Sequence, residues 1–328
     1  VVTMVMTTRL RLHSLLIALA VALAFHGVEE GLKFLASGGT HKVLGVRILG
    51  DNNSLALAEV MMLPILAYLY KYIENKNIRL GLLGASIICF ISVIGTSSRG
   101  GFIGLAILAG GYLQTSQRKF QIALMIVVIA VLFVWLVPDT YFERMNTIGE
   151  AHEDSSFMGR VIAWKISTLI AMDHPLFGGG FHAVQTPPIW LSYVPKLYIL
   201  DFIPTPPPDV LHAAHSIYFE VLGDLGFTGE ALFVTLLWTG ISNATAIRKL
   251  TVNKPQMLWL FDMAGSLRLT LIVYAVSGAA LSMAYFELYY LLLAMLSVMY
   301  RMASSQPKPP ETDPAQPVLF GGRASEGV

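Results

Sequence analysis

Three basic residues stand out because each lies in a short polar motif at the edge of an apolar run. Arg99 is in "GTSSRGG", Arg160 is in "GRVIAW", and His215 is in "LHAAHSIYF". Guanidinium groups pair bidentately with phosphate oxygens, and a histidine can accept a proton near neutral pH. Together these residue types could bind an anionic group and activate a hydroxyl beside it.

Each of the three also has an ordinary interpretation. Arg99 could simply reach lipid phosphates, Arg160 could be a charge on a helix surface, and His215 could be an interfacial side chain. His212 and His215 are three residues apart and could share a helix face that binds a metal. The sequence defines no third ligand for them, so we predict no metal site.

The composition determines the class of protein. The chain has 328 residues, of which 55% are hydrophobic and 13% charged, and its mean hydropathy is +0.63. Soluble domains carry about 25% charged residues, so the composition predicts an all-α polytopic integral membrane protein. The net charge of +1, without a basic cluster, gives no indication of nucleic-acid binding. The single cysteine, Cys89, excludes a disulfide framework within the chain and a cysteine metal site.

Apolar runs predict about eight transmembrane helices. They cover roughly residues 12–34, 54–73, 80–96, 100–115, 120–138, 214–244, 264–284 and 286–302. Alternate connections and the two ends hold thirteen Lys and Arg, whereas the other short loops hold only three. Cytoplasmic loops are rich in these residues, so we expect both ends of the chain in the cytoplasm.

One long connection predicts a large periplasmic loop that contains helices. The predicted organisation has four parts: N-terminal spans in 1–138, the loop in 139–213, three further spans in 214–302, and a disordered tail in 303–328. Within the loop, a helix is expected from about residue 158 to residue 172, ended by "DHP" and three glycines. On the same side, Asp51 and Asn52 in "LGDNNSLALA" favour a helix start, or a polar contact to substrate.

The sequence lacks the motifs of several enzyme families. It contains no Walker A loop, no G-x-S-x-G, no H-E-x-x-H and no D-x-D. The missing D-x-D removes the usual carboxylate pair of a metal-dependent sugar-nucleotide transferase.

The motifs in combination carry a resemblance to a known family. The segments "SSRGGFIGL", "GRVIAW…MDHPLFGGGF" and "AHSIYFEVLGDLGFTGEALF" resemble the O-antigen ligase and polymerase family of bacterial membrane glycosyltransferases. The stretch "HGVEEGLKFLASGG…LGDNNSLALAEVMMLPIL" is similar to the O-glycosylation ligases that accompany exosortase A systems. The similarity covers roughly residues 20–300. Family members usually carry additional N-terminal spans, and this chain begins with Val1, so we expect it to be a fragment.

The resemblance implies a reaction and its partners. Such ligases work in the bacterial inner membrane, with the active site facing the periplasm. They move a glycan from undecaprenyl pyrophosphate to a hydroxyl of a protein or of lipid A core, with inversion and without metal or other cofactor. Arg99 and Arg160 would bind the pyrophosphate, and His215 would deprotonate or orient the acceptor hydroxyl. Four residues are candidates for support: His212, Asp51, Asn52 and Trp164.

Two alternatives remain open from the sequence. A polymerase would use the same chemistry but add the glycan to another lipid-linked glycan. A transporter of lipid-linked oligosaccharide would need a path of ionisable residues through the spans. The charges within the predicted spans are few, and they lie mostly toward the outer ends.

Overall fold

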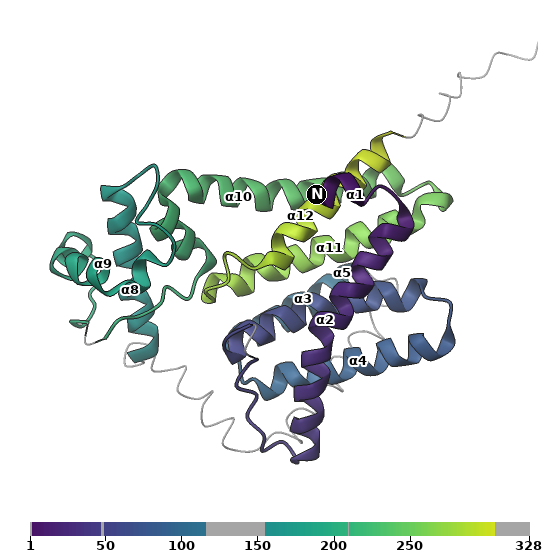
Figure 1. Ribbon diagram of the computed structural model, residues 1–328, viewed down its shortest axis with the longest axis horizontal. Helices are drawn as coiled ribbons and strands as arrows, with labels where there is room; N and C mark the ends of the chain where they lie inside the picture. The colour runs from purple at the N-terminus through teal and green to yellow at the C-terminus, as the bar shows by residue number, and fades with distance from the viewer. Residues whose placement is uncertain (1, 47–48, 116–154, 209, 306–328) are drawn as a thin grey trace, which may run out of the picture.

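The computed structural model describes residues 2–46, 49–115, 155–208 and 210–305, and within these ranges it contains helices and no strands. The chain is therefore an all-α membrane protein, as predicted (Figure 1). The α-helices are α1 (Val2–Val5), α2 (Arg9–Ala36), α3 (Asn52–Tyr72), α4 (Lys76–Gly95), α5 (Arg99–Thr115), α8 (Ser155–Asp173), α9 (Pro187–Tyr193), α10 (Ile217–Thr251), α11 (Leu258–Ser277) and α12 (Glu287–Ser304). Short 3₁₀ helices cover Ala183–Gln185, Val194–Leu200, Pro255–Met257 and Gly278–Ala280.

Five of the described helices are long and apolar enough to cross a membrane, namely α2, α3, α4, α10 and α11 with its flanking 3₁₀ turns. The helices α5 and α12 also match predicted spans, and they have 17 and 18 residues. At about 1.5 Å per residue these two are slightly shorter than a hydrocarbon core of about 30 Å. The span predicted at 120–138 lies outside the described residues.

The long helices form a bundle with α3 at its centre. Of the apolar window of α3, 78% is buried, compared with 28% for α4. The helix α3 packs against α2, α4, α5 and α11, while α10 packs against α11, α12 and α8. Figure 1 shows α3, α4, α10, α11 and α12 running roughly side by side, with α2 crossing obliquely in front of α3 and α4.

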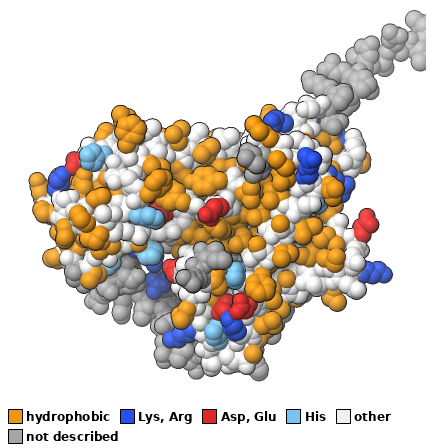
Figure 2. Space-filling model, in the orientation of Figure 1, with side chains coloured by type: hydrophobic (Ala, Val, Ile, Leu, Met, Phe, Trp, Pro, Cys, Tyr) orange, Lys and Arg blue, Asp and Glu red, His pale blue; other side chains and the backbone are white. Residues whose placement is uncertain are grey.

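Small residues allow these helices to approach closely. Gly104 of α5 lies against α3 and α11, where an added Cβ would be 2.8 Å from Ser277 Oγ and 3.0 Å from Val60 Cγ1. Gly31 of α2 faces α4 so closely that a Cβ would lie 2.4 Å from the Ile88 carbonyl oxygen. Membrane helices associate through such close packing because lipid is as apolar as their own side chains. Hydrophobic side chains also cover much of the surface that Figure 2 shows, as expected for a protein that is surrounded by lipid.

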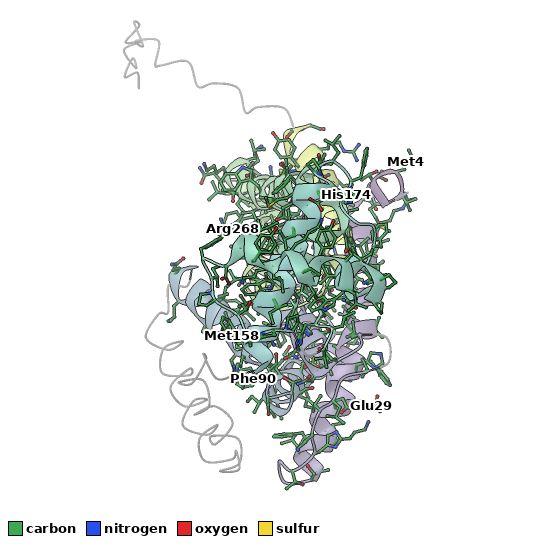
Figure 3. The ribbon with its side chains drawn as sticks, turned by 90° about the vertical axis from the view of Figure 1, so that its left-hand side faces the viewer. Met4, Glu29, Phe90, Met158, His174 and Arg268 are labelled. Carbon is green, nitrogen blue, oxygen red and sulfur yellow. The ribbon has the colours of Figure 1, made fainter. Side chains whose placement is uncertain are left out.

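A smaller lobe, made of α8, α9 and the turns between them, lies at one end of the bundle (Figure 1). Seen from that end, α8 lies across the bundle, with Met158 and His174 near its opposite ends (Figure 3). The helix begins at Ser155 rather than near residue 158 as predicted, and it ends at Asp173. The lobe has its own apolar core, formed by α8, α9 and the 3₁₀ turn between them.

Two further boundaries differ from the prediction. The span predicted at 264–284 stops earlier, because α11 ends at Ser277 and residues 281–286 form a non-helical loop before α12. The helix α10 runs on to Thr251 but is interrupted at Gly226, whose φ of 69° and ψ of −171° are not helical. Residues 227–251 are about 37 Å long at 1.5 Å per residue, which is enough to cross the membrane without the first turns of α10.

Candidate functional site

The turn that carries Arg99 is fixed by its own hydroxyl groups. Thr96 Oγ1 donates to the Val93 carbonyl oxygen, and Ser97 adopts a left-handed conformation with φ of 53°. Ser98 Oγ accepts a hydrogen bond from Gly101 N at 3.2 Å, which satisfies a backbone donor in the first turn of α5. Thr96 and Ser98 are buried, whereas Arg99, the first residue of α5, is exposed at the end of the bundle.

The start of α3 is tied to this turn. Asn52 Nδ2 donates to the Thr96 carbonyl oxygen at 2.8 Å, so α3 and the Arg99 turn are held together. Asp51 caps α3 by accepting from Ser54 N at 2.8 Å, which confirms the helix-start interpretation. Burial raises the pKa of Asp51, but hydrogen bonds from Ser54 and Asn53 and the nearby charge of His215 outweigh it. The net pKa is lowered, and Asp51 is a carboxylate at neutral pH.

His215 lies just before α10 in a left-handed backbone conformation, with φ of 42°. Its N–H donates to Ser282 Oγ at 2.9 Å, and the side chain is half-buried. Burial lowers the pKa of His215, the charges of Arg160 and His212 lower it further, and the charge of Asp51 opposes them. The net effect is a neutral imidazole at pH 7, which is the form that can accept a proton.

Arg160 and Trp164 face this segment from successive turns of α8. Trp164 Nε1 donates to the Ala214 carbonyl oxygen at 2.6 Å, and its ring stacks on Phe219 with centroids 5.0 Å apart. These contacts fix α8 beside the residue that precedes His215. Arg160 is half-buried, and its charge reaches His215.

His212 lies against the backbone of α8. A Cβ added to Gly159 would be 2.5 Å from two atoms of the His212 ring, so the ring needs a glycine at that position. The Trp190 ring is another neighbour of His212, with centroids 6.1 Å apart. Residues 211–215 are not helical, so the expectation that His212 and His215 could share a helix face is wrong. Among the described residues, no group of three His, Cys, Asp or Glu side chains could hold a metal ion.

The glycine-rich turn after α8 packs on the kink in α10. Gly179 N donates to Gly223 O, and Gly180 N donates to Asp224 O, both at 2.9 Å. Gly178 has φ of 62°, and a Cβ there would be 2.5 Å from the Asp224 carbonyl oxygen. At Gly226, a Cβ would be 2.6 Å from the Pro175 carbonyl oxygen. Two segments far apart in sequence therefore meet through backbone atoms.

Asp224 is a residue that the sequence prediction did not assign to the site. Its carboxylate accepts from the backbone N–H of His182 at 2.9 Å and of Ala183 at 3.0 Å, and from Tyr285 Oη at 3.0 Å. It thereby joins the lobe, α10 and the 281–286 loop. The sequence marks Asp224 only as one of a few acidic residues in a mainly apolar segment, two positions before Gly226, and this is a weak signal.

A groove of about 440 Å³ opens beside these residues. Its polar lining includes Ser54, His182, Glu220, Ser282 and Tyr285. The rest of the lining is mainly apolar and comes from α2, α12 and the 281–286 loop; it includes Leu19, Ala22, Leu23, Phe286, Leu288 and Leu291. Since Ser282 accepts the N–H of His215, the polar end of the groove adjoins the candidate base.

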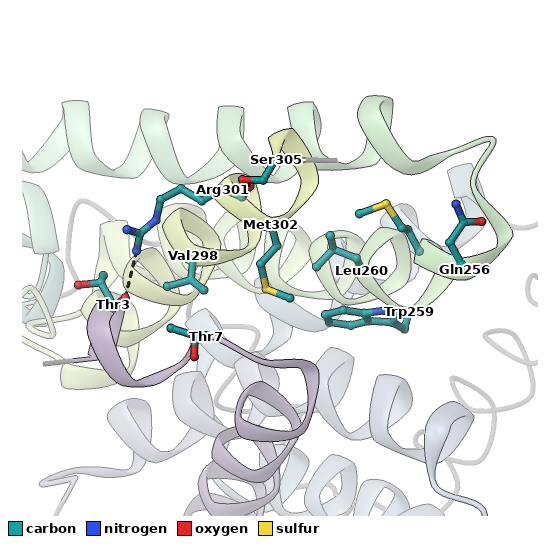
Figure 4. Close-up of a pocket in the computed structure, with 10 residues that line it drawn as sticks. Thr3, Thr7, Gln256, Trp259, Leu260, Val298, Arg301, Met302 and Ser305 are labelled. Atoms are coloured by element: carbon teal, nitrogen blue, oxygen red, sulfur yellow. Dashed lines mark hydrogen bonds between the residues drawn. The ribbon is translucent and has the colours of Figure 1, made fainter. Parts of the chain in front are cut away.

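Another cavity, of about 480 Å³, lies at the opposite end of the bundle (Figure 4). It is formed by residues before α2, the start of α11 and the end of α12, and Arg301 Nη2 donates to the Thr3 carbonyl oxygen at 3.0 Å beside it. Because α11 and α12 are joined by the 281–286 loop at their other ends, this cavity is a helix length away from His215.

The structure thus brings most of the predicted residues to one end of the bundle. Arg160, His212 and Asp51 all influence His215 electrostatically, Trp164 packs beside it, and Asn52 ties the Arg99 turn to Asp51. Four further residues at this end of the bundle were not named as site residues from the sequence: Glu220, Asp224, Ser282 and Tyr285.

The chain is similar to a known protein family over part of its length. Residues 84–234 match the family model described as O-antigen ligase. The matched segment contains Arg99, Arg160, Trp164 and His215, but not Asp51 or the 281–286 loop. No curated protein matches the chain. By this match the chain carries an O-antigen ligase domain in residues 84–234, and the match together with the apolar helices points to a multi-pass bacterial membrane protein.

Proposed function

We propose that the protein is a membrane glycan ligase that transfers a glycan from undecaprenyl pyrophosphate to an acceptor hydroxyl. The observation that carries the proposal is the electrostatic grouping of Arg160 and Asp51 around a neutral, half-buried His215. The family match supports glycan transfer, and this grouping supports the roles of the individual side chains.

In this mechanism His215 acts as the base. Its neutral imidazole takes the proton of the acceptor hydroxyl while the oxygen attacks the anomeric carbon of the glycan. Asp51 stabilises the imidazolium that forms, because a nearby carboxylate favours the charged histidine. General bases of this kind contribute on the order of 10²–10⁴ in rate.

The leaving group is stabilised by the two arginines. As the bond from the anomeric carbon to the pyrophosphate oxygen breaks, its electron pair stays on that oxygen. Arg99 and Arg160 would offset the growing negative charge, and each such contact is typically worth about 3–4 kcal/mol in the transition state. Attack from the face opposite the pyrophosphate inverts the anomeric centre. These residues supply every role without a metal or other cofactor.

The groove beside His215 suits a lipid substrate. Its polar end adjoins the base, and its apolar side lies along α2 and α12, where a polyprenyl chain could remain in the membrane. We place the reaction at the periplasmic face of the inner membrane, where the loop between the fifth and sixth predicted spans would lie. The acceptor would be a protein, as in O-glycosylation ligases of exosortase systems, or lipid A core.

The test is glycan transfer in reconstituted vesicles from a lipid pyrophosphate donor, with EDTA present and donor binding measured in parallel. Arg99→Ala and Arg160→Ala should weaken donor binding, whereas His215→Ala should abolish transfer and leave donor binding intact. Gly81→Ala is a matched control, because nothing lies within 4 Å of the added Cβ. If the three site variants transfer glycan as fast as the control, the assigned roles are wrong.

The acceptor distinguishes a ligase from a polymerase. Transfer to a defined protein or lipid A core supports the ligase, while growth of the lipid-linked glycan alone supports a polymerase. A transporter would move the donor across the vesicle membrane without forming a new glycosidic bond. Lys33 is paired with Glu29 and Glu30 at 2.8 and 2.7 Å, so these three charges of the first predicted span interact with one another.

A further inference from the structure

The turn after α8 exposes large apolar side chains at the end of the bundle that carries His215. Leu176, Phe177 and Phe181 are 62%, 82% and 67% exposed, although they belong to a turn held by several backbone hydrogen bonds. We call these three residues the apolar turn. Side chains of this size are not left in water at a rigid position without cost, so a partner surface is expected there.

The position of the apolar turn relative to α10 identifies that surface. Its backbone is fixed to α10 by the hydrogen bonds of Gly179 and Gly180, and Thr228 N donates to the Pro175 carbonyl oxygen at 3.4 Å. The stretch of α10 after Gly226, residues 227–251, is long enough by itself to cross the membrane. The apolar turn lies at the start of this stretch.

Beyond the kink, α10 also carries exposed apolar side chains. Phe227 is 48% exposed immediately after the kink, and Leu232 and Trp238 are 61% and 71% exposed farther along the helix. On a membrane-crossing helix such exposed apolar side chains lie against lipid. Phe181 also contacts Tyr285, at 5.0 Å between ring centroids, so the turn is packed against the loop that lines the groove.

Ionisable groups lie where the turn leaves α8. Asp173 and Lys196 form an ion pair at 2.5 Å, and His174 is exposed beside them. The Lys196 hydrogen bond is the main reason that the pKa of Asp173 is lowered, so this pair stays charged at neutral pH. Aromatic and apolar tips with charged neighbours are typical of segments at the boundary between lipid tails and headgroups.

We propose that the apolar turn inserts into the lipid leaflet next to the site and anchors α8 at the membrane surface. The anchor would hold Arg160, on the same helix, at the depth of a lipid phosphate. The proposed occupant is the bilayer itself, and the alternatives are another protein or a second copy of the chain. The inference does not depend on the proposed reaction, because insertion is measured without substrate.

Spin-label accessibility provides the test, with a matched pair of leucines in the lobe. Leu176 is 62% exposed in the apolar turn, and Leu191 is 66% exposed on α9, which lies farther from the bundle (Figure 1). Each would be changed to Cys in a Cys89→Ser background and labelled with a nitroxide, with Phe177→Cys as an additional variant. The protein would be studied in vesicles of phosphatidylethanolamine and phosphatidylglycerol.

Oxygen concentrates in lipid tails and a nickel chelate concentrates in water, so their collision rates report depth. We expect the Leu176→Cys label to favour oxygen several-fold relative to the Leu191→Cys label, which should favour the nickel chelate. Equal preference for the chelate at both positions would overturn the proposal. Protection of the Leu176→Cys label from both reagents would also overturn it, in favour of a protein partner.

A second measurement uses the unsubstituted protein, so that a folding defect in a variant cannot obscure the result. A phospholipid that carries a photoreactive diazirine near its headgroup should label the peptide 174–184 more strongly than the peptide 187–193. Equal labelling of the two peptides would contradict insertion of the apolar turn.

Discussion

Substitution of Gly226 by alanine should separate the apolar turn from α10. The φ of 69° and ψ of −171° lie in a region that only glycine adopts readily, and an L-residue held there costs about 1–3 kcal/mol. The new Cβ would also be 2.6 Å from the Pro175 carbonyl oxygen and 2.8 Å from that of His174. Such overpacking typically costs about 1–3 kcal/mol more. The sum, about 2–6 kcal/mol, is large enough to open a local contact or to unfold a marginally stable protein.

The assay is hydrogen exchange by mass spectrometry, combined with thermal unfolding. In Gly226→Ala, the amides of Gly179 and Gly180 should lose protection, because their acceptors on α10 move away. Gly81→Ala is the control: its Cβ meets open space within a helix, so it should be neutral or stabilising by up to about 1 kcal/mol. If Gly226→Ala keeps both amides protected and unfolds at the same temperature as Gly81→Ala, the account of the kink is refuted.

The remaining predictions concern the environment of His215. The imidazole must be unprotonated to act as the base, so transfer should fall as the pH drops through the pKa of His215. Asp51→Asn removes the charge that raises this pKa and should shift the acid limb of kcat/KM to lower pH, whereas Arg160→Gln should shift it to higher pH. Shifts of equal sign, measured in pH–rate profiles, would contradict the assignment. Gly159→Ala should displace the ring of His212 and lower the unfolding temperature, because the added Cβ would lie 2.5 Å from that ring. Combining it with His212→Ala should recover part of the loss, and purely additive effects in the double variant would disagree with this contact.

Much of the bundle could be predicted from the sequence, because apolar runs of membrane length directly determine where helices form. The helix start at Asp51 was also predictable, since capping is a local interaction within a few residues. The break of α10 at Gly226 was not, because a glycine inside an apolar run is compatible with a continuous helix. Its conformation depends on the carbonyl of Pro175, which is distant in sequence.

The residue types of the candidate site could be predicted from the sequence, but the contacts between these residues could not. Arg160 and His215 were named from short motifs, and the structure brings them within electrostatic reach of each other. The hydrogen bond from His215 N to Ser282 Oγ depends on a loop that the hydropathy pattern assigned to a span. Hydropathy reports the average environment of a segment, so it cannot distinguish the last turn of a helix from an apolar loop at the membrane surface.

The hydrogen bonds of Asp224 also limit how the protein can be re-engineered. One carboxylate accepts from two backbone groups of the lobe and from the hydroxyl of Tyr285, so three separate stretches of chain share a single acceptor. In a chimera that receives only the lobe of a relative, the backbone N–H groups that donate to Asp224 would come from one parent and the Asp224 carboxylate from the other. Exchange of the lobe between relatives therefore requires three pieces to be moved together: the lobe, the first turns of α10 and the 281–286 loop.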